Sequence, residues 1–541
     1  MNATITSVAP ATGDLVTPHG SAGGSTMALA RVEAGRLLRH PLTVIALFLL
    51  TVYWAYPLVT GADSVHFAVL QNADRATQFP CAFLLGGAAM IVSNLAVLRS
   101  RRFGTDAVLD VATLTRSHRT AAHLLALVPL AVLATALVVA QIVAVAAQPA
   151  AVGRINPAEL AVGPLCVILL GCLGVLLGRL VPLPVVAPLA LVAFAVVTLI
   201  PAIPGIASGS GPQWQWLFPV AYEDHNDNPL PADLLSRPVA SHNFYLLALI
   251  LLAAAVSLLA GRGSAQAGTA AVRRVTAIVA AVVLLGVSTA VQIARPSAAV
   301  LDARTRAAQS PAAGQVCRNT QPWTYCAYPD FTGRIPHWDR LVRAVVGQVA
   351  PVTSVRPLTV RQHVRADQGP KPITEVMPAA PVAGWLSDAA AAGYPPEDVT
   401  VGTAWSAEAE FAFAASVARA VIIGGPPPSR IDPACGARGV VILWLAVQAS
   451  PRSARGLAQL ESSSSAGVAF FTGGYGSGLV FDVRQLEAVR NLARIPAADV
   501  GARMRQSLAA LTAPGATTED AAQLLGAGQL TAPSIDSVDR C

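Results

Sequence analysis

The chain has 541 residues, of which 54% are hydrophobic and only 12% are charged, and its mean hydropathy is +0.55. Soluble domains carry about twice that share of charged residues, so the composition excludes an ordinary soluble protein. The net charge of +7 does not indicate nucleic-acid binding, because the basic residues lie in short loops beside apolar segments and form no face interleaved with aromatic residues.

The N-terminal 26 residues are rich in Gly, Ser, Thr and Pro and contain neither a basic segment nor a hydrophobic core. They are not typical of a cleavable secretory signal and predict a disordered cytoplasmic tail over 1–26. Segment 27–40 then places Leu29, Val32, Leu37 and Leu38 on one stripe, with charged residues around the rest. This pattern predicts an amphipathic helix along the inner membrane surface, or else an extension of the first span.

Seven apolar segments follow, each close to the roughly 20 residues that a helix needs to cross hydrocarbon. They cover residues 41–59, 79–98, 121–147, 158–178, 185–206, 242–260 and 275–294. We therefore predict an α-helical integral membrane protein with a six-span core over 41–260 and a seventh span over 275–294. Its Gly86, Gly87, Gly171, Gly174 and Gly178 predict close packing between spans.

The arginines predict the orientation, because basic residues favour the cytoplasmic side of a membrane. One set of loops, with the segment before the first span, contains twelve arginines: Arg31, Arg36, Arg39, Arg99, Arg101, Arg102, Arg116, Arg119, Arg179, Arg262, Arg273 and Arg274. The other set contains three before the last span: Arg75, Arg154 and Arg237. We expect a multi-pass protein of the cytoplasmic membrane with a cytoplasmic N-terminus, so that residues 295–541 form an extracytoplasmic domain.

Within the predicted spans the strongest polar residues are Asn94 and Gln141. Neither side chain relays protons as a carboxylate does, which argues against a proton-coupled transporter. Hydrogen bonding between helices and contact with a transported molecule both remain open for these two residues.

The segment 99–120 is a charged island between the second and third predicted spans. Asp106 and Asp110 are four residues apart and share one face of a helix, beside an apolar patch that contains Leu109. Such a rod between two spans can transmit motion from a cytoplasmic partner. A solvated loop that sets topology, or contact of Arg101 and Arg102 with anionic lipid, are the alternatives.

Three features together resemble the transmembrane subunit of an ABC-2 type ABC exporter. They are an amphipathic helix before span one, the basic segment "RRFGTDAVLDVATLTRSHRTAAH" between spans two and three, and a long outer loop "GPQWQWLFPVAYEDHN" before span six. The resemblance covers residues 27–260, and the seventh span and large outer domain depart from it. It implies that the basic segment is a coupling helix for an ATPase, with contact residues Arg101, Arg102, Asp106, Leu109, Asp110 and Arg119.

The same resemblance implies a function and partners. The permease would export a hydrophobic or amphipathic small molecule, peptide or lipid, as a homodimer or heterodimer of permease subunits in the lipid bilayer. ATP would be bound by a separate cytoplasmic subunit, because no G-x-x-x-x-G-K-[ST] motif occurs in this chain. We expect no cofactor and no enzymatic activity of its own.

The outer domain has the composition of a mixed α/β, helix-rich fold. Its most apolar piece, 439–449, is too short to span a membrane and predicts a buried helix or strand. Cys317 and Cys326 lie nine positions apart on the oxidising side and predict a local disulfide, with Cys435 and Cys541 as a second pair. The glycine-rich segment 473–478 predicts a turn.

An alternative function is a membrane-anchored extracytoplasmic binding or sensing protein, in which the spans only hold the outer domain. A membrane-tethered enzyme is a further alternative, but the sequence contains no H-E-x-x-H or G-x-S-x-G motif. We therefore assign no catalytic residue and no metal ligand.

Overall fold

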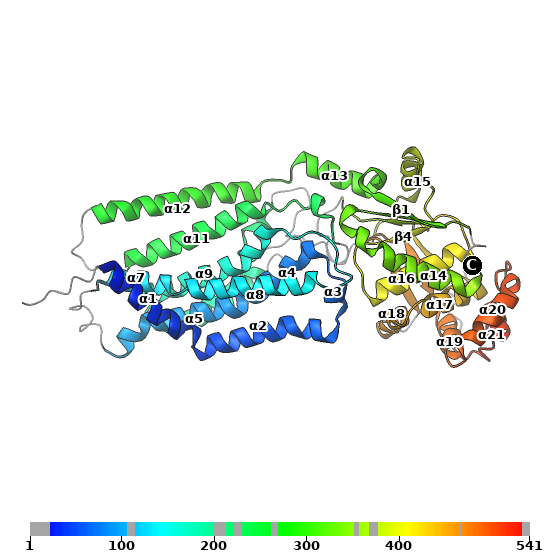
Figure 1. Cartoon of the computed structure of the whole chain (residues 1–541), viewed down its shortest axis with the longest axis horizontal. Coiled ribbons are helices and arrows are strands. Elements are labelled where there is room, and N and C mark those ends of the chain that lie inside the picture. Colours follow the sequence, from blue (N-terminus) through cyan, green and yellow to red (C-terminus); the bar gives the residue numbers. More distant parts are fainter. Residues whose placement is uncertain are drawn as a thin grey trace, which may run out of the picture.

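The computed structural model describes residues 22–104, 114–199, 213–220, 229–260, 269–350, 356–366, 377–464 and 467–532. A bundle of long helices lies at one end of the molecule and a mixed domain at the other, with the N-terminal helix α1 at the far end of the bundle (Figure 1). Within these ranges, six helical segments are long and apolar enough to cross a membrane: Pro41–Thr60, Leu70–Arg102, Arg116–Ala146, Pro157–Leu180, Val239–Ala260 and Val275–Gln309. The chain is therefore a helical membrane protein.

The first half of the chain supplies the bundle and its connections. Its elements are α1 (Ala22–Leu38), α2 (Pro41–Thr60), α3 (Asp63–His66), η1 (Leu70–Asn72), α4 (Ala73–Pro80), η2 (Cys81–Gly86), α5 (Gly87–Arg102), α7 (Arg116–Leu125), α8 (Val128–Ala146), α9 (Pro157–Leu180), α10 (Val186–Leu199), η4 (Trp214–Leu217), η5 (Ala232–Leu234), α11 (Val239–Ala260) and α12 (Thr269–Ile293).

Six of the seven predicted spans correspond to these long helices. The fifth, predicted over 185–206, is the shorter apolar helix α10, and the rest of that prediction lies outside the described residues. The second begins at Leu70 instead of residue 79, because η1 and α4 continue into η2, a π-helical turn after Pro80. Hydropathy did not predict this extension, because α4 has a polar composition.

Helix α9 is the centre of the bundle and packs against α5, α8 and α11. The predicted close packing at glycines is present. A Cβ on Gly174 would lie 2.2 Å from the carbonyl oxygen of Met90, so α5 and α9 touch backbone to backbone there. Asn94 is fully buried at this contact, and its amide donates to the carbonyl of Gly174 at 3.5 Å. Asn94 therefore lies in a helix–helix contact.

Helix α1 covers most of the predicted segment 27–40, but it begins at Ala22 and not at residue 27. Its buried stripe contains Ala30, Ala34 and Leu37, and faces α7, whereas Val32 is 52% exposed. The extra turn forms although Gly and Ser are weak helix formers, because tertiary packing overrides propensity; Thr26 in that turn is buried. Residues 1–21 of the predicted tail lie outside the described part.

The second half forms a mixed domain, here called the outer domain after its predicted location. Its elements are α13 (Ala298–Gln309), η6 (Pro311–Gly314), β1 (Val316–Thr320), β2 (Trp323–Ala327), η7 (Pro329–Arg334), α14 (Ile335–Val349), β3 (Thr359–Gln362), α15 (Val382–Ala391), β4 (Val399–Val401), α16 (Ala407–Ile422), β5 (Ile431–Pro433), α17 (Gly436–Gln448), α18 (Pro451–Ser462), β6 (Val468–Phe471), β7 (Gly478–Phe481), α19 (Val483–Leu492), α20 (Ala497–Leu511) and α21 (Thr518–Leu525).

The outer domain contains two small sheets. One has the strand order β1-β2-β3-β4, antiparallel between β1 and β2 and parallel elsewhere, and the other has the order β5-β7-β6. Helices α14, α16 and α17 are the largest helical contributors to the core, and the predicted apolar piece 439–449 lies largely in the buried part of α17. The predicted turn at 473–478 joins β6 to β7.

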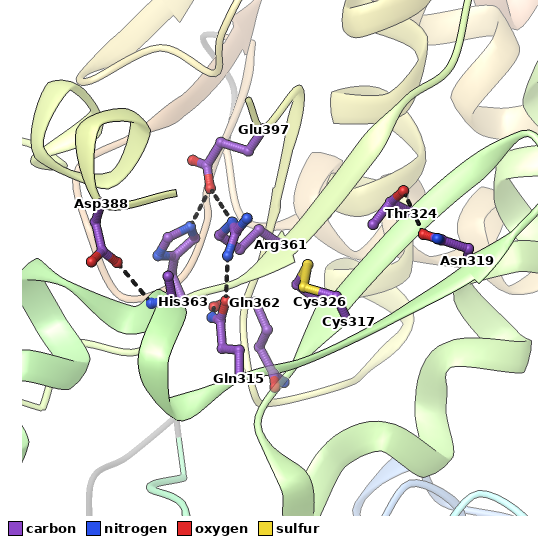
Figure 2. Close-up of a disulfide and its surroundings, with 11 residues drawn as sticks. Gln315, Cys317, Asn319, Thr324, Cys326, Arg361, Gln362, His363, Asp388 and Glu397 are labelled. Carbon is purple, nitrogen blue, oxygen red and sulfur yellow. Dashed lines mark hydrogen bonds and ion pairs between the residues drawn. A yellow bond between two sulfur atoms is a disulfide. The ribbon is translucent and has the colours of Figure 1, made fainter. Parts of the chain in front are cut away.

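The predicted disulfide between Cys317 and Cys326 is present, and it links facing positions of the β1–β2 hairpin (Figure 2). Cys435 is also disulfide-bonded, and Cys541 lies outside the described residues. The three cysteines of the spans, Cys81, Cys166 and Cys172, are free and buried.

Candidate functional site

The bundle and the outer domain are joined by the short helix α3, which follows the first span. Asp63 at its start accepts a hydrogen bond from the backbone N–H of Ala407, at the first turn of α16, with a length of 2.6 Å. The same carboxylate pairs with the guanidinium of Arg452. A helix N-terminus favours a carboxylate through its free N–H groups and its dipole, so α3 docks at a position suited to its charge.

Phe67, directly after α3, inserts into the core of the outer domain and is 4% exposed. Its ring centre lies 5.3 Å from the ring of His337, and the guanidinium of Arg452 lies over it at 4.5 Å. The buried Arg334 donates to the Phe67 carbonyl at 2.7 Å. This aromatic anchor makes the contact between the two halves a packed interface and not a flexible linker.

A second attachment involves the loop between α8 and α9. Asp330 of the outer domain accepts a hydrogen bond from Arg154 at 2.6 Å and another from the backbone N–H of Ala232 at 2.7 Å. Val152 in this loop bridges to Val69, which ties the loop to the chain just before the second span. The domain is therefore held by three connections of the bundle: helix α3, the loop between α8 and α9, and the segment at Ala232.

Between these attachments lies a cavity of about 850 Å³, here called the junction cavity. Helices α2, α4 and α8 line its membrane side, and helix α16, the end of β6 and the loop after it line the opposite side. The membrane-side residues are Tyr53, Trp54, Pro57, Ala76, Thr77, Gln141, Ile142 and Val145. Its volume suits a drug-sized molecule.

The lining of the junction cavity is mainly apolar and aromatic. Its charged members are the two acids Asp63 and Glu408, and no Lys, Arg or His occurs among the lining residues that the structure describes. Asp63 is neutralised by Arg452, whereas Glu408 is exposed and has no ion-pair partner within the described ranges. The local charge is negative, so the cavity suits uncharged or cationic molecules better than anions.

Gln141 is the predicted polar residue of the spans that reaches this site. It lies on α8, is 8% exposed, and lines the junction cavity. Gln141 therefore lies where a molecule in the cavity would contact it. Asn94 is not among the lining residues of the cavity and contacts a neighbouring helix instead.

The glycine-rich loop 473–478 separates the junction cavity from a buried polar cluster. Gly473 and Gly474 line the cavity and adopt φ of 64° and 81°, a backbone conformation that favours glycine. Tyr475 packs edge-on against Trp385 at 5.2 Å between ring centres. The loop is therefore held from behind by the domain core.

That buried cluster consists of His363, Arg361 and Glu397, all at most 1% exposed (Figure 2). His363 bonds to Glu397 at 2.6 Å, and Arg361 lies 3.6 Å from the same carboxylate and donates to Gln315 at 2.8 Å. The His363 ring stacks on Trp385 at 3.6 Å. The charges of Arg361 and Glu397 compensate each other, and Gly473 of the loop lies beside His363.

A second carboxylate, Glu410, lies behind Trp405, which lines the cavity. Burial alone raises the pKa of Glu410, but hydrogen bonds from His337, Ser450 and Trp405 outweigh it and bring the pKa below its usual value. The carboxylate is therefore ionised at neutral pH and fixes the orientation of Trp405. Among the residues described, no group of three or more His, Cys, Asp or Glu side chains is arranged to hold a metal ion.

Three of the predicted coupling residues, Arg101, Arg102 and Arg119, lie at the other end of the bundle. Arg101 and Arg102 belong to the last turn of α5, and Arg119 belongs to α7, so the ends of the segment 99–120 are continuous with the spans. Asp106, Leu109 and Asp110 lie outside the described residues. The segment was predicted as a helical rod between two spans, with a solvated loop as the alternative. Its described ends are helical, since α5 ends at Arg102 and α7 begins at Arg116.

Sequence reasoning missed Asp63 and Phe67. They lie in a short polar connection that hydropathy assigns to a loop, and their partners are hundreds of positions away in the chain. A signal was available in "GADSVHF", where an acid and an aromatic residue interrupt an otherwise apolar region. No protein-family model matches this chain, and no curated protein matches it either.

Proposed function

We propose that this chain is the membrane-spanning permease subunit of an ATP-driven ABC exporter, and that the junction cavity is the outer part of its substrate pathway. ATP hydrolysis would take place in a separate cytoplasmic subunit. The N-terminal end of the bundle would face the cytoplasm, in agreement with its arginines, and the outer domain would face the exterior.

One observation carries this proposal: the helices that flank the segment 103–115 line the junction cavity at their opposite ends. The helical segment before it runs from Arg102 back to Ala76 and Thr77 in the cavity. The helices after it run from Arg116 to Gln141 and Val145, which line the cavity too. A force applied between the two helices would therefore reach the cavity directly.

The construction of the bundle supports this mechanical link. Glu33 of α1 accepts hydrogen bonds from Arg99 of α5 at 3.0 and 3.2 Å, so the amphipathic helix and the second span move together at this end. Farther along the second span, Pro80 and the π-helical turn η2 interrupt regular α-helix. Such turns are places where a helix bends, which allows one end to respond to displacement of the other.

The cavity also supports a substrate class. Aromatic and aliphatic side chains line most of it, with Gln141 and Thr77 as polar contacts from the spans. A hydrophobic or amphipathic molecule, uncharged or cationic, fits this lining. A protein whose spans only anchor a binding domain has no need for a cavity between the spans and that domain. A dimer of permease subunits, of identical or different chains, would complete the pathway.

The test is purification of the full chain from its native cells in mild detergent, with partners identified by mass spectrometry. We expect a near-stoichiometric ATPase to copurify with the natural chain. It should also copurify with Gln141→Trp, in which the larger side chain fills the cavity. The double variant Arg102→Glu/Asp106→Arg should lose this ATPase. Cells carrying Gln141→Trp should accumulate a lipophilic cationic dye that the natural chain exports. If no ATPase accompanies the natural chain, the proposal is wrong and the anchored binding protein becomes the better explanation.

A further inference from the structure

The cytoplasmic-side end of the bundle, as proposed above, contains a second hollow that the transport pathway does not use. It has a volume of about 980 Å³, and residues of α1, α5 and α7 line it. Helices α1 and α7 lie at the end of the bundle farthest from the outer domain (Figure 1). The charged lining residues of the hollow include Arg31 and Arg36 from α1, Arg39 just after α1, and Arg99 and Arg102 from α5. We refer to this hollow as the arginine groove.

The charges of the arginine groove are strongly unbalanced. Glu33 is the one carboxylate among its described lining residues, and it is 6% exposed and already bound by Arg36 at 2.7 Å and by Arg99. Five guanidinium groups thus face a single carboxylate, which leaves an excess of four positive charges with the histidines neutral. Arg31, Arg39 and Arg102 are exposed and have no acidic partner in the described part of the chain.

Much of the remaining lining is apolar. It consists of Leu37 from α1, Val92, Leu95 and Ala96 from α5, and Ala126 after α7, together with the polar residues Ser93 and His123. Leu37, Val92 and Ala126 are buried, whereas the guanidinium groups of Arg31, Arg39 and Arg102 belong to exposed residues. Guanidinium groups bind phosphate oxygens through two parallel hydrogen bonds, and an apolar surface beside them suits hydrocarbon. The groove therefore offers cationic groups for a lipid phosphate and an apolar surface for its acyl chains.

The position of the groove selects a lipid over a soluble anion. Arg99 and Arg102 lie in the last turn of a span, and α2 starts at Pro41, two residues after Arg39. The groove is therefore level with the ends of the spans, where lipid headgroups lie, and not beyond the membrane surface where a soluble partner docks first. Exposed Met27 and Val32 of α1 extend the apolar surface at this level.

We propose that the arginine groove binds the headgroup of an anionic phospholipid, with the phosphate held by Arg31, Arg39 and Arg102 and the acyl chains along α5. The bound lipid would connect α1 to the second span beside the Glu33–Arg99 pair. This inference rests on the proposed orientation of the bundle but not on transport, and Arg31 and Arg39 lie outside the proposed ATPase contact.

The experiment is a thermal unfolding titration of the purified full chain in detergent with phosphatidylglycerol, phosphatidylcholine or inorganic phosphate. Phosphatidylglycerol should raise the melting temperature saturably, and the other two should not. Each arginine near an anionic headgroup contributes a factor of about five, so Arg31→Gln/Arg39→Gln should raise the half-saturating concentration about twenty-five-fold. The matched control, Arg318→Gln/Arg340→Gln, removes two exposed charges from the outer domain and should change nothing.

Several results would overturn the proposal. They are an equal response to phosphatidylcholine, an equal response to inorganic phosphate, or a groove variant that titrates like the control. Loss of a copurifying cytoplasmic protein from the groove variant, with an unchanged lipid response, would identify the groove as a protein contact instead. The groove side chains are exposed, so the variant without lipid should melt at the same temperature as the control, which separates binding from folding.

Discussion

Replacing Phe67 with alanine tests whether the bundle and the outer domain form one packed unit. Phe67 belongs to the connection after the first span but is buried in the core of the outer domain, at 4% exposure. Removing a buried Phe side chain costs about 3–5 kcal/mol, because both the apolar transfer energy and the contacts around the new hollow are lost. The cation–π contact with Arg452 adds about 0.5–1 kcal/mol.

These energies act on opening of the junction, since Phe67 contacts both halves. A loss of about 3 kcal/mol corresponds to a more than hundredfold increase in the open population. Hydrogen exchange of the full chain in detergent, followed by mass spectrometry, reports this population directly. Peptides that cover 63–70 and 403–410 should exchange about a hundredfold faster in Phe67→Ala, and peptides from α9 should not change.

The matched control is Phe48→Ala on α2, where the ring is 65% exposed on the outside of the bundle. It removes the same side chain without touching the junction, so exchange at 63–70 should remain as in the natural chain. If Phe67→Ala exchanges there like Phe48→Ala, the aromatic anchor does not hold the two halves together, and a cavity that depends on this junction loses its support.

Two further predictions concern the bundle and the outer domain. Gly174→Val should lower the melting temperature, because its Cβ would lie 2.2 Å from the carbonyl of Met90, whereas the matched Gly286→Val has no atom within 4 Å and should have little effect; equal melting temperatures would contradict the packing. Glu410 has a pKa below its usual 4.5, so its stabilisation is complete above that value and lost as the pH falls through the lower folded pKa. Glu410→Gln should therefore be less stable than the natural chain at neutral pH, and the difference should shrink at acid pH in thermal unfolding. A pH-independent difference would show that the hydrogen bond to His337 is not charge-assisted.

Much of the membrane half could be predicted from the sequence, because its signals are local. A helix that crosses hydrocarbon needs an unbroken apolar length, so six of the predicted spans correspond to long apolar helices. The disulfide between Cys317 and Cys326 follows from a hairpin closed within ten residues, and the buried helix at 439–449 follows from its composition. Each of these depends on neighbours in the chain.

The candidate site was not predictable in this way. Asp63 meets Ala407 across 344 positions, and nothing in the periodicity of either segment indicates the other. The junction cavity exists because α2, α4 and α8 end at one level and the outer domain is held above them by α3, Phe67 and Asp330. Gln141 shows the difference between what the sequence determines and what the tertiary structure decides. The sequence identifies it as a rare polar residue in a span, but only the packing of α8 decides that it faces a cavity and not another helix. The reason is that apolar length specifies a span without specifying which side of the helix faces which neighbour.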